Sequence, residues 1–210
     1  MAQFASASFT GTAGDTLPAA DANWTKHANS PAGANIIISD ANRGRGDAVN
    51  ANFYYHAGTP ASPDYSVSAT LFAKEANGGN MGIGVTGRNS TTATTHYLAW
   101  YYGAATDRWE LYKVVAGAAT LLGSSAQALT DETGYQVELR MVGTTIGLYA
   151  NGSSTPTISV TDSSITAAGK AGLRANQEAG SVGNTVGLHI DDFSADDAVT
   201  NRYLLLMGVG

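Results

Sequence analysis

Hydrophobic and polar residues alternate along much of the chain, most clearly within the segment from Tyr97 to Gly152. Between Tyr135 and Met141 every second residue is apolar, and the residues between them are polar or charged. Neighbouring side chains of a β-strand point to opposite faces, so this pattern predicts a strand with one buried and one solvent-facing side. Similar short runs, rich in aromatic and β-branched residues, are bounded by Gly, Asp or Asn. The segment is therefore typical of consecutive antiparallel strands.

Turn signals and further apolar runs extend this pattern over the rest of the chain. Gly143-Thr144 and Asn151-Gly152 predict tight turns, and the second favours a primed hairpin turn. The apolar run Ile36–Ile38 predicts a central strand that is buried on both faces. Helical periodicity is almost absent. Further strands are expected within residues 4–10, 22–39, 49–55, 65–72, 81–88, 157–160, 171–174 and 186–195.

Several of these segments resemble the concanavalin A-like lectin/glucanase superfamily, in its laminin-G-like branch. The resemblance rests on the run Arg108-Trp-Glu-Leu-Tyr-Lys-Val-Val115, on Gly143-Thr-Thr-Ile-Gly-Leu-Tyr149 and on His189-Ile-Asp-Asp-Phe193. It implies an all-β, two-sheet antiparallel jelly-roll β-sandwich over residues 1–195. Residues 196–210 lie beyond the resemblance, and their change in composition predicts a C-terminal apolar arm or additional strand. The superfamily includes lectins, hydrolases, adhesion modules and virion proteins, so the resemblance implies a fold and leaves the function open.

Composition narrows the possible partners. The chain has 210 residues, a net charge of −6 and no cysteine, which excludes disulfides and thiolate metal sites. Its 11 Lys and Arg residues are scattered, so no nucleic-acid partner is expected. No apolar run approaches the ~20 residues that a membrane span needs, so no membrane insertion is expected. No basic segment followed by an apolar one precedes the first strand, so no signal peptide is expected.

One glycine pattern suggests a nucleotide site. Gly82-Ile-Gly84-Val-Thr-Gly87 matches the dinucleotide fingerprint, which needs a strand before it and a helix after it. A Thr-rich segment follows here instead, so we interpret these glycines as positions in a tightly packed strand.

Glycoside hydrolysis is the enzymatic activity that the resemblance suggests. It needs two carboxylates about 5–5.5 Å apart for retention or about 6.5–9.5 Å apart for inversion. In the glucanase branch the carboxylates form a Glu-x-Asp-x-Glu cluster on one strand, and this chain has none. Glu110 and Glu138 fall on predicted strands, where we interpret both as solvent-facing positions. The sequence therefore predicts no catalytic residues and no glycan hydrolysis.

Aromatic side chains are the candidates for sugar binding, because rings stack on sugar faces. The residues selected are Trp100, Tyr102, Tyr54 and Tyr55. Alternation places Leu98, Trp100 and Tyr102 on one face of their strand, whereas Trp109 and Leu111 are assigned to the core. Packing inside the sandwich is the alternative explanation for each of these rings.

The resemblance also implies a Ca²⁺ ion, because sandwich families with a similar Ile-Asp-Asp-Phe strand hold one at that strand. Asp191 would supply a carboxylate, and the segment from Gly11 to Asp15 would supply further oxygen ligands. The alternative is that Asp191 and Asp192 form a solvated strand end. No other cofactor is expected.

The apolar run at the end of the chain is a candidate partner contact. Its residues are Tyr203, Leu204, Leu205, Leu206 and Met207. Five successive apolar side chains cannot all face one sheet, because neighbours point to opposite sides. The run either adds as a strand to the edge of a neighbouring chain or folds back as a final strand of its own sandwich.

Three functions follow from these observations. The first is a non-catalytic structural protein of a virus-like particle, foremost a bacteriophage capsid decoration or tail-associated protein. Its partners would be other virion proteins and copies of itself, with surface glycans as further ligands. It would be made in the host cytoplasm and reach the extracellular space as part of the virion. The alternatives are a soluble carbohydrate-binding module and, third, a glycoside hydrolase.

Overall fold

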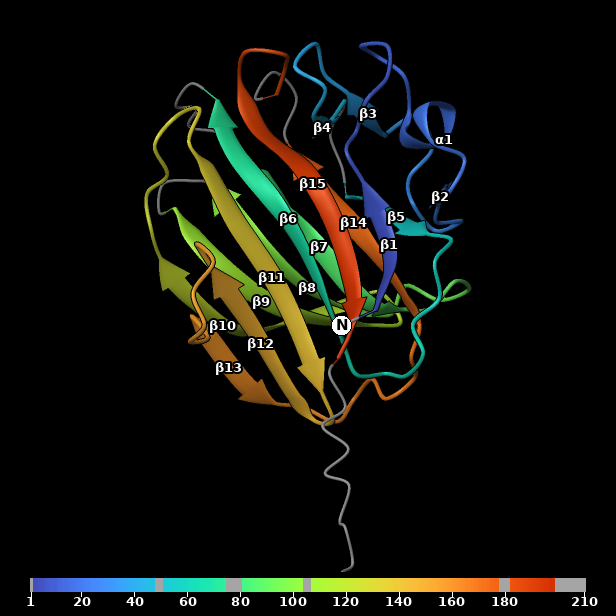
Figure 1. The fold of residues 1–210 in the computed structure, drawn as a ribbon, viewed down its shortest axis with the longest axis vertical. Helices are drawn as coiled ribbons and strands as arrows, with labels where there is room; N and C mark the ends of the chain where they lie inside the picture. Colours follow the sequence, from blue (N-terminus) through green and yellow to red (C-terminus); the bar gives the residue numbers. More distant parts are fainter. Residues whose placement is uncertain (1, 48–50, 75–80, 104–106, 178–181, 199–210) are drawn as a thin grey trace, which may run out of the picture.

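The protein folds as a sandwich of two antiparallel β-sheets. A computed structural model describes residues 2–47, 51–74, 81–103, 107–177 and 182–198. In Figure 1 the eight-stranded sheet lies in front of the seven-stranded sheet. All strand pairs are antiparallel among the described residues, which confirms the all-β, two-sheet prediction. The single helix there, α1 (Leu17–Ala20), is far too short to cross a membrane.

The two sheets contain strands from all parts of the chain. The eight-stranded sheet has the order β13 (Ile158–Thr161), β12 (Thr145–Ala150), β11 (Gly134–Val142), β6 (Tyr65–Lys74), β15 (Gly187–Asp197), β4 (Gly44–Gly46) and β3 (Ile36–Ile38), with β1 (Gln3–Ala7) also paired to β15. The seven-stranded sheet has the order β10 (Ala118–Ala126), β9 (Arg108–Val115), β8 (His96–Gly103), β7 (Met81–Asn89), β14 (Lys170–Gln177), β5 (Asn52–His56) and β2 (Trp24–Lys26).

The core lies between the sheets and follows the predicted alternation. Val137, Leu139 and Met141 of β11 are fully buried, and they belong to the same core cluster as Trp109 and Leu111 of β9. The intervening residues of β11 point away from the core. Each strand therefore has one face in the core and one outer face, and a functional surface on either sheet must come from the outer positions.

The turns that were predicted between β11, β12 and β13 are present. Gly143 and Thr144 alone connect β11 to β12, and Gly143 has φ +56°, which glycine adopts without strain. Asn151 and Gly152 both have positive φ, 60° and 68°, as a primed turn requires. This turn begins a longer connection to β13.

The position of one strand and the end of another differ from the prediction. Ile36–Ile38 is buried as expected, but β3 is the last strand in its sheet order and is not central. Its outer edge is covered by the segment before α1, because Ile38 exchanges backbone hydrogen bonds with Gly14 and Asp15. The last strand, β15, continues to Asp197, two residues past the expected end of the sandwich. The apolar run Tyr203 to Met207 lies outside the described residues.

Candidate functional site

A groove of about 300 Å³ lies on the outer face of the seven-stranded sheet. Strands β8, β9, β10 and β14 supply its lining. The side chains that carry its chemistry are Trp100, Tyr102, Arg108, Glu110, Tyr112, Arg174 and Asn176. The groove therefore combines aromatic rings, two guanidinium groups, a carboxylate and an amide.

Two glycines of β7 make room for the Trp100 indole. A Cβ on Gly82 would lie 2.6 Å from Cε3 and from Cζ3 of the Trp100 ring, so the ring packs directly over this residue. A Cβ on Gly84 would lie 2.2 Å from the Ala99 carbonyl oxygen. Gly87 faces the core, where a Cβ would lie 2.3 Å from Cε of Met141. The interpretation of this glycine pattern as tight strand packing is confirmed.

A buried carboxylate joins two of the groove residues. Glu110 accepts a hydrogen bond from Trp100 Nε1 at 2.9 Å and one from Arg108 Nε at 2.6 Å. Only 1% of Glu110 is exposed, so its interpretation as a solvent-facing position is wrong. The physical reason is that Trp100 lies directly across from Glu110 on β8 and covers it, while Arg108 neutralises its charge.

The aromatic rings form one cluster. The Trp100 and Tyr102 rings are stacked with centroids 5.9 Å apart, and the Tyr112 ring meets Trp100 edge-on at 5.9 Å. The Arg108 guanidinium lies 4.9 Å from the centre of the Tyr102 ring. Burial is the main cause that raises the pKa of Tyr112, and the nearby Glu110 carboxylate is the second. The phenol therefore stays a hydrogen-bond donor at neutral pH. Trp100 is only 7% exposed, whereas Tyr102 and Tyr112 are half-buried, so the two tyrosines present most of the ring surface.

Arg174 of β14 lies on the other side of β7 from this aromatic cluster. It pairs with Gly84 of β7, which in turn pairs with Trp100 of β8. One terminal nitrogen of its guanidinium lies 3.2 Å from Nε2 of His96, and its Nε is buried without a hydrogen-bond partner. Burial, and next the Arg174 charge, lower the pKa of His96 to about 3, so this ring is neutral and accepts a hydrogen bond from Arg174.

The predicted sugar-binding residues do not all lie together. Trp100 and Tyr102 share the groove, as the alternation on β8 predicts. Tyr55 lies on β5, three positions away from β8 in the sheet order, and does not line the groove. Tyr54 points into the core, is 2% exposed and donates a hydrogen bond to Oδ1 of Asn35 at 3.2 Å. It is therefore not part of this surface.

The groove also contains residues that were not selected from the sequence. Arg108 and Glu110 share the parity of Tyr112 on β9, a signal that the alternation already contained. Arg174 and Asn176 reach the groove only because β14 pairs with β7. That pairing joins residues about ninety positions apart, so the local sequence pattern cannot predict that Arg174 and Asn176 line the groove.

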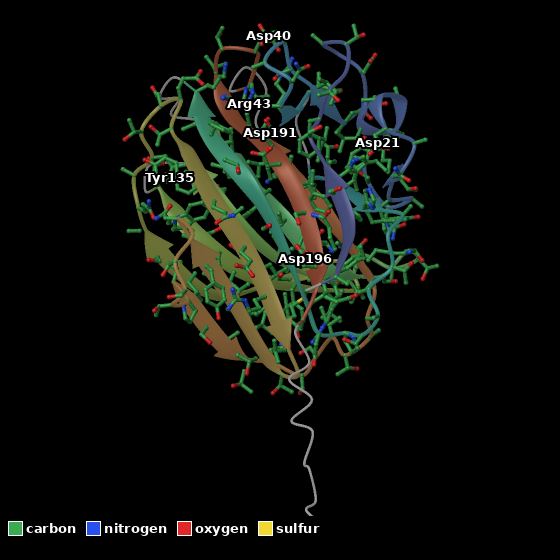
Figure 2. All side chains as sticks on the ribbon, viewed as in Figure 1. Asp21, Asp40, Arg43, Tyr135, Asp191 and Asp196 are labelled. Carbon is green, nitrogen blue, oxygen red and sulfur yellow. The ribbon has the colours of Figure 1, made fainter. Side chains whose placement is uncertain are left out.

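The predicted Ca²⁺ ligands belong to β15 and to the segment before α1. Asp191 is on β15, and its Oδ1 accepts the backbone N–H of Asp192 at 2.8 Å; burial raises the pKa of Asp191. In Figure 2 Asp191 lies near Arg43, well separated along β15 from Asp196. Oδ2 of Asp15 accepts the backbone N–H of Thr12 at 3.1 Å. Within the described residues no group of three or more His, Asp or Glu side chains is arranged to hold a metal ion, and the calcium site stays a prediction.

A larger hollow of about 620 Å³ lies among α1, β1, β2, β3 and β15. Phe9, Trp24 and Phe193 line it, but each ring is at most 4% exposed and offers little surface for stacking. None of its described lining residues is basic, and two are aspartates. The smaller groove on the seven-stranded sheet is therefore the better candidate for ligand binding.

Comparison with known proteins identifies the fold. No protein-family model and no curated protein matches the chain. Among solved structures, the carbohydrate binding module CBM66 from Bacillus subtilis superposes with a TM-score of 0.64 at 17% identity, over 90% of this chain and 100% of that one. The exoplasmic/lumenal domain of VIP36, in its Ca²⁺- and mannose-bound form, has a TM-score of 0.57 at 6% identity, over 87% and 86%.

A β-1,3-glucanase from Mycobacterium marinum is a third similar structure. Its TM-score is 0.55 at 11% identity, over 93% of this chain and 99% of that one. The protein therefore has the jelly-roll sandwich fold of the lectin/glucanase type, as predicted. Identities this low carry the fold alone, so the function must be argued from the groove itself.

Proposed function

We propose that this protein is a carbohydrate-binding module and that the groove on the outer face of its seven-stranded sheet holds the sugar. The observation that carries the proposal is the cluster of Trp100, Tyr102 and Tyr112 beside Arg108, Arg174 and Asn176 in one groove. The structural similarity to CBM66, a carbohydrate-binding module by description, supports the same conclusion. This function takes precedence over the virion role expected from the sequence, which none of these observations supports and which stays a prediction.

The groove offers both kinds of contact that a sugar uses. The tyrosine rings can stack on the C–H face of a pyranose or furanose, and their hydroxyl groups can donate hydrogen bonds. The arginine and asparagine side chains can donate to ring hydroxyls. A volume of about 300 Å³ is at the lower end of the range for ligand sites, which suits one sugar unit or a chain end.

Binding without cleavage is part of the proposal. Of the described residues that line the groove, Glu110 is the one carboxylate, and both of its oxygens accept hydrogen bonds from protein groups. Glycoside hydrolysis in most families needs a second carboxylate within about 5–9.5 Å. We therefore expect no new reducing ends when the protein is incubated with a polysaccharide that it binds.

The test compares tyrosines on the two outer faces. Tyr102→Ala and Tyr112→Ala remove rings from the groove, and Tyr149→Ala removes a half-buried ring from the eight-stranded sheet as the matched control. Binding to a panel of neutral and acidic oligosaccharides is measured by isothermal titration calorimetry. We expect each groove variant to bind about twofold to tenfold more weakly, since a stacked ring contributes about 0.5–1.5 kcal/mol. The proposal fails if no oligosaccharide binds, or if Tyr149→Ala loses as much affinity as the groove variants.

A further inference from the structure

The described residues of the groove carry a positive charge that they do not balance among themselves. Two arginines and one carboxylate are among these lining residues, and Glu110 is paired with Arg108 at 2.6 Å. Arg174 is then left as an additional cation. The chain as a whole has a net charge of −6, so a basic lining at this place runs against the average of the molecule.

Among the residues that the structure describes, no anion compensates Arg174. His96 on β8 is its hydrogen-bond partner and is neutral, because burial and the Arg174 charge hold the pKa of His96 far below its usual range. Tyr112 on β9 keeps its proton at neutral pH, because its pKa is raised. On β7 the residue opposite Arg174 is Gly84, which has no side chain. Among the described residues, the groove side chains around Arg174 are therefore all uncharged, apart from the Arg108–Glu110 pair.

Burial makes this arrangement costly for the free protein. Burial lowers the pKa of Arg174, which shows that its environment disfavours the charge. Its Nε is enclosed without an acceptor, and an unsatisfied buried donor destabilises a fold. A guanidinium presents its donors as a planar fork that matches a carboxylate with two parallel hydrogen bonds. An anionic group in the groove, paired with the accessible part of the guanidinium, would supply the missing negative charge.

We propose that the groove selects a sugar that carries a carboxylate, a uronic acid unit, whose carboxylate pairs with Arg174 while its ring contacts Tyr102 and Tyr112. This inference rests on the proposed function and specifies its ligand class. Arg108 cannot play the same part, because its charge is already matched by Glu110. The Arg174 guanidinium is thus the specificity-determining group, and the tyrosines contribute affinity to acidic and neutral sugars alike.

The experiment uses ligands that differ in one group. Oligosaccharides of galacturonic, glucuronic and mannuronic acid are compared with their carboxyl-reduced neutral counterparts by isothermal titration calorimetry on the full chain. We expect the wild type to bind an acidic ligand about tenfold to 100-fold more tightly than its reduced form, the range for a hydrogen-bonded charge pair. Added salt should narrow this preference.

Variants then test whether Arg174 causes the preference for acidic ligands. Arg174→Gln should bind acidic and reduced ligands within about twofold of each other. Arg174→Lys keeps the charge and should retain part of the preference. Arg140→Gln, on the outer face of the opposite sheet, is the matched control and should leave the preference unchanged. Thermal unfolding of each variant checks that it is folded.

The possible failures are distinguishable. If the wild type binds acidic and reduced ligands equally, or if Arg174→Gln keeps the preference, the inference is overturned. If in those cases Tyr102→Ala still weakens binding as expected, the proposed function stands without the inference. If neither ligand form binds the wild type, the proposed function fails as well. The wild-type comparison needs no variant, so the inference can be overturned even if Arg174→Gln does not fold.

Discussion

The outer faces of the two sheets contain nearly the same charge pattern, but the glutamate is fully buried on only one of them. On β9 of the seven-stranded sheet, Arg108 and Glu110 are two residues apart, and their side chains are 29% and 1% exposed. On β11 of the eight-stranded sheet, Glu138 and Arg140 have the same spacing, and their side chains are 23% and 39% exposed. The first pair lies within the groove, and the second lies on the outer face of the eight-stranded sheet beside Ser68 and Tyr149.

The difference comes from the neighbouring strands. Glu110 faces Trp100 of β8, and the glycines of β7 let that indole lie flat beside it. Glu138 lies between Ser68 of β6 and Tyr149 of β12. The Tyr149 ring packs over the Arg140 guanidinium at 4.1 Å, and the Glu138 side chain stays 23% exposed. An arginine–glutamate pair on one strand therefore becomes a buried site or a solvated pair according to residues elsewhere in the chain. Matched substitutions on the two sheets can test how much the burial of such residues contributes to stability.

The largest difference is expected for the two glutamates. Glu110→Ala leaves the Trp100 N–H and the Arg108 charge without their acceptor, and should lower the free energy of unfolding by about 3 kcal/mol or more. Glu138→Ala breaks a solvated pair and should cost less than about 1 kcal/mol. Urea denaturation of the wild type and both variants measures these losses. Equal losses would show that the two pairs are energetically alike and would contradict the contrast in burial.

A smaller difference is expected for glycines on the two faces. In Gly84→Ala the added methyl group collides with the Ala99 carbonyl and the Trp100 backbone, which should cost about 1–3 kcal/mol. In Gly147→Ala on β12 the methyl group meets only the Tyr149 ring edge at 2.9 Å. That half-buried ring can move, so the change in stability should stay within about 1 kcal/mol. The contrast fails if denaturation midpoints shift by the same amount in both variants.

The smallest effect near neutral pH concerns one buried histidine on each sheet. Burial is the main cause that lowers the pKa of His96 to about 3 and that of His189 to about 4. Both rings are neutral in the folded state, whereas the unfolded chain takes up protons near pH 6.5. Stability is therefore fully present above about pH 6.5 and falls as the pH drops, by at most about 1.4 kcal/mol per unit for each histidine.

Replacement of each histidine sharpens the comparison. Between about pH 6.5 and pH 4, His96→Gln and His189→Gln should reduce the loss of unfolding free energy per pH unit by the same amount. They should diverge below pH 4, where His189 begins to protonate in the folded protein and His96 does not. Denaturation curves collected over this pH range measure the slopes. A wild-type slope that neither substitution changes would contradict the assignment.

Local patterns predicted the strands well, because alternation and turn residues act within a few positions. The strand at residues 65–72, the faces of β8 and the turn at Gly143 are examples. The burial of Glu110 and the position of Arg174 were missed, since both depend on which distant strands become neighbours. The prediction that Ile36–Ile38 is a central strand was wrong for a related reason. The strand lies at the sheet edge, and it is buried because the segment before α1, which is distant in sequence, covers that edge. Non-local pairing, and not strand propensity, decides what the groove contains.

The position of β15 has a consequence for how the chain folds. This strand is the last one described, yet it pairs with β1, β4 and β6 in the eight-stranded sheet. A nascent chain that ends before Gly187 leaves one edge of β6 open, and an open edge is a template for pairing with other chains. Closure then joins Asp197 to Ala2 through a backbone hydrogen bond. Such high contact order makes folding slow, and the eight-stranded sheet is completed only after its last strand has left the ribosome.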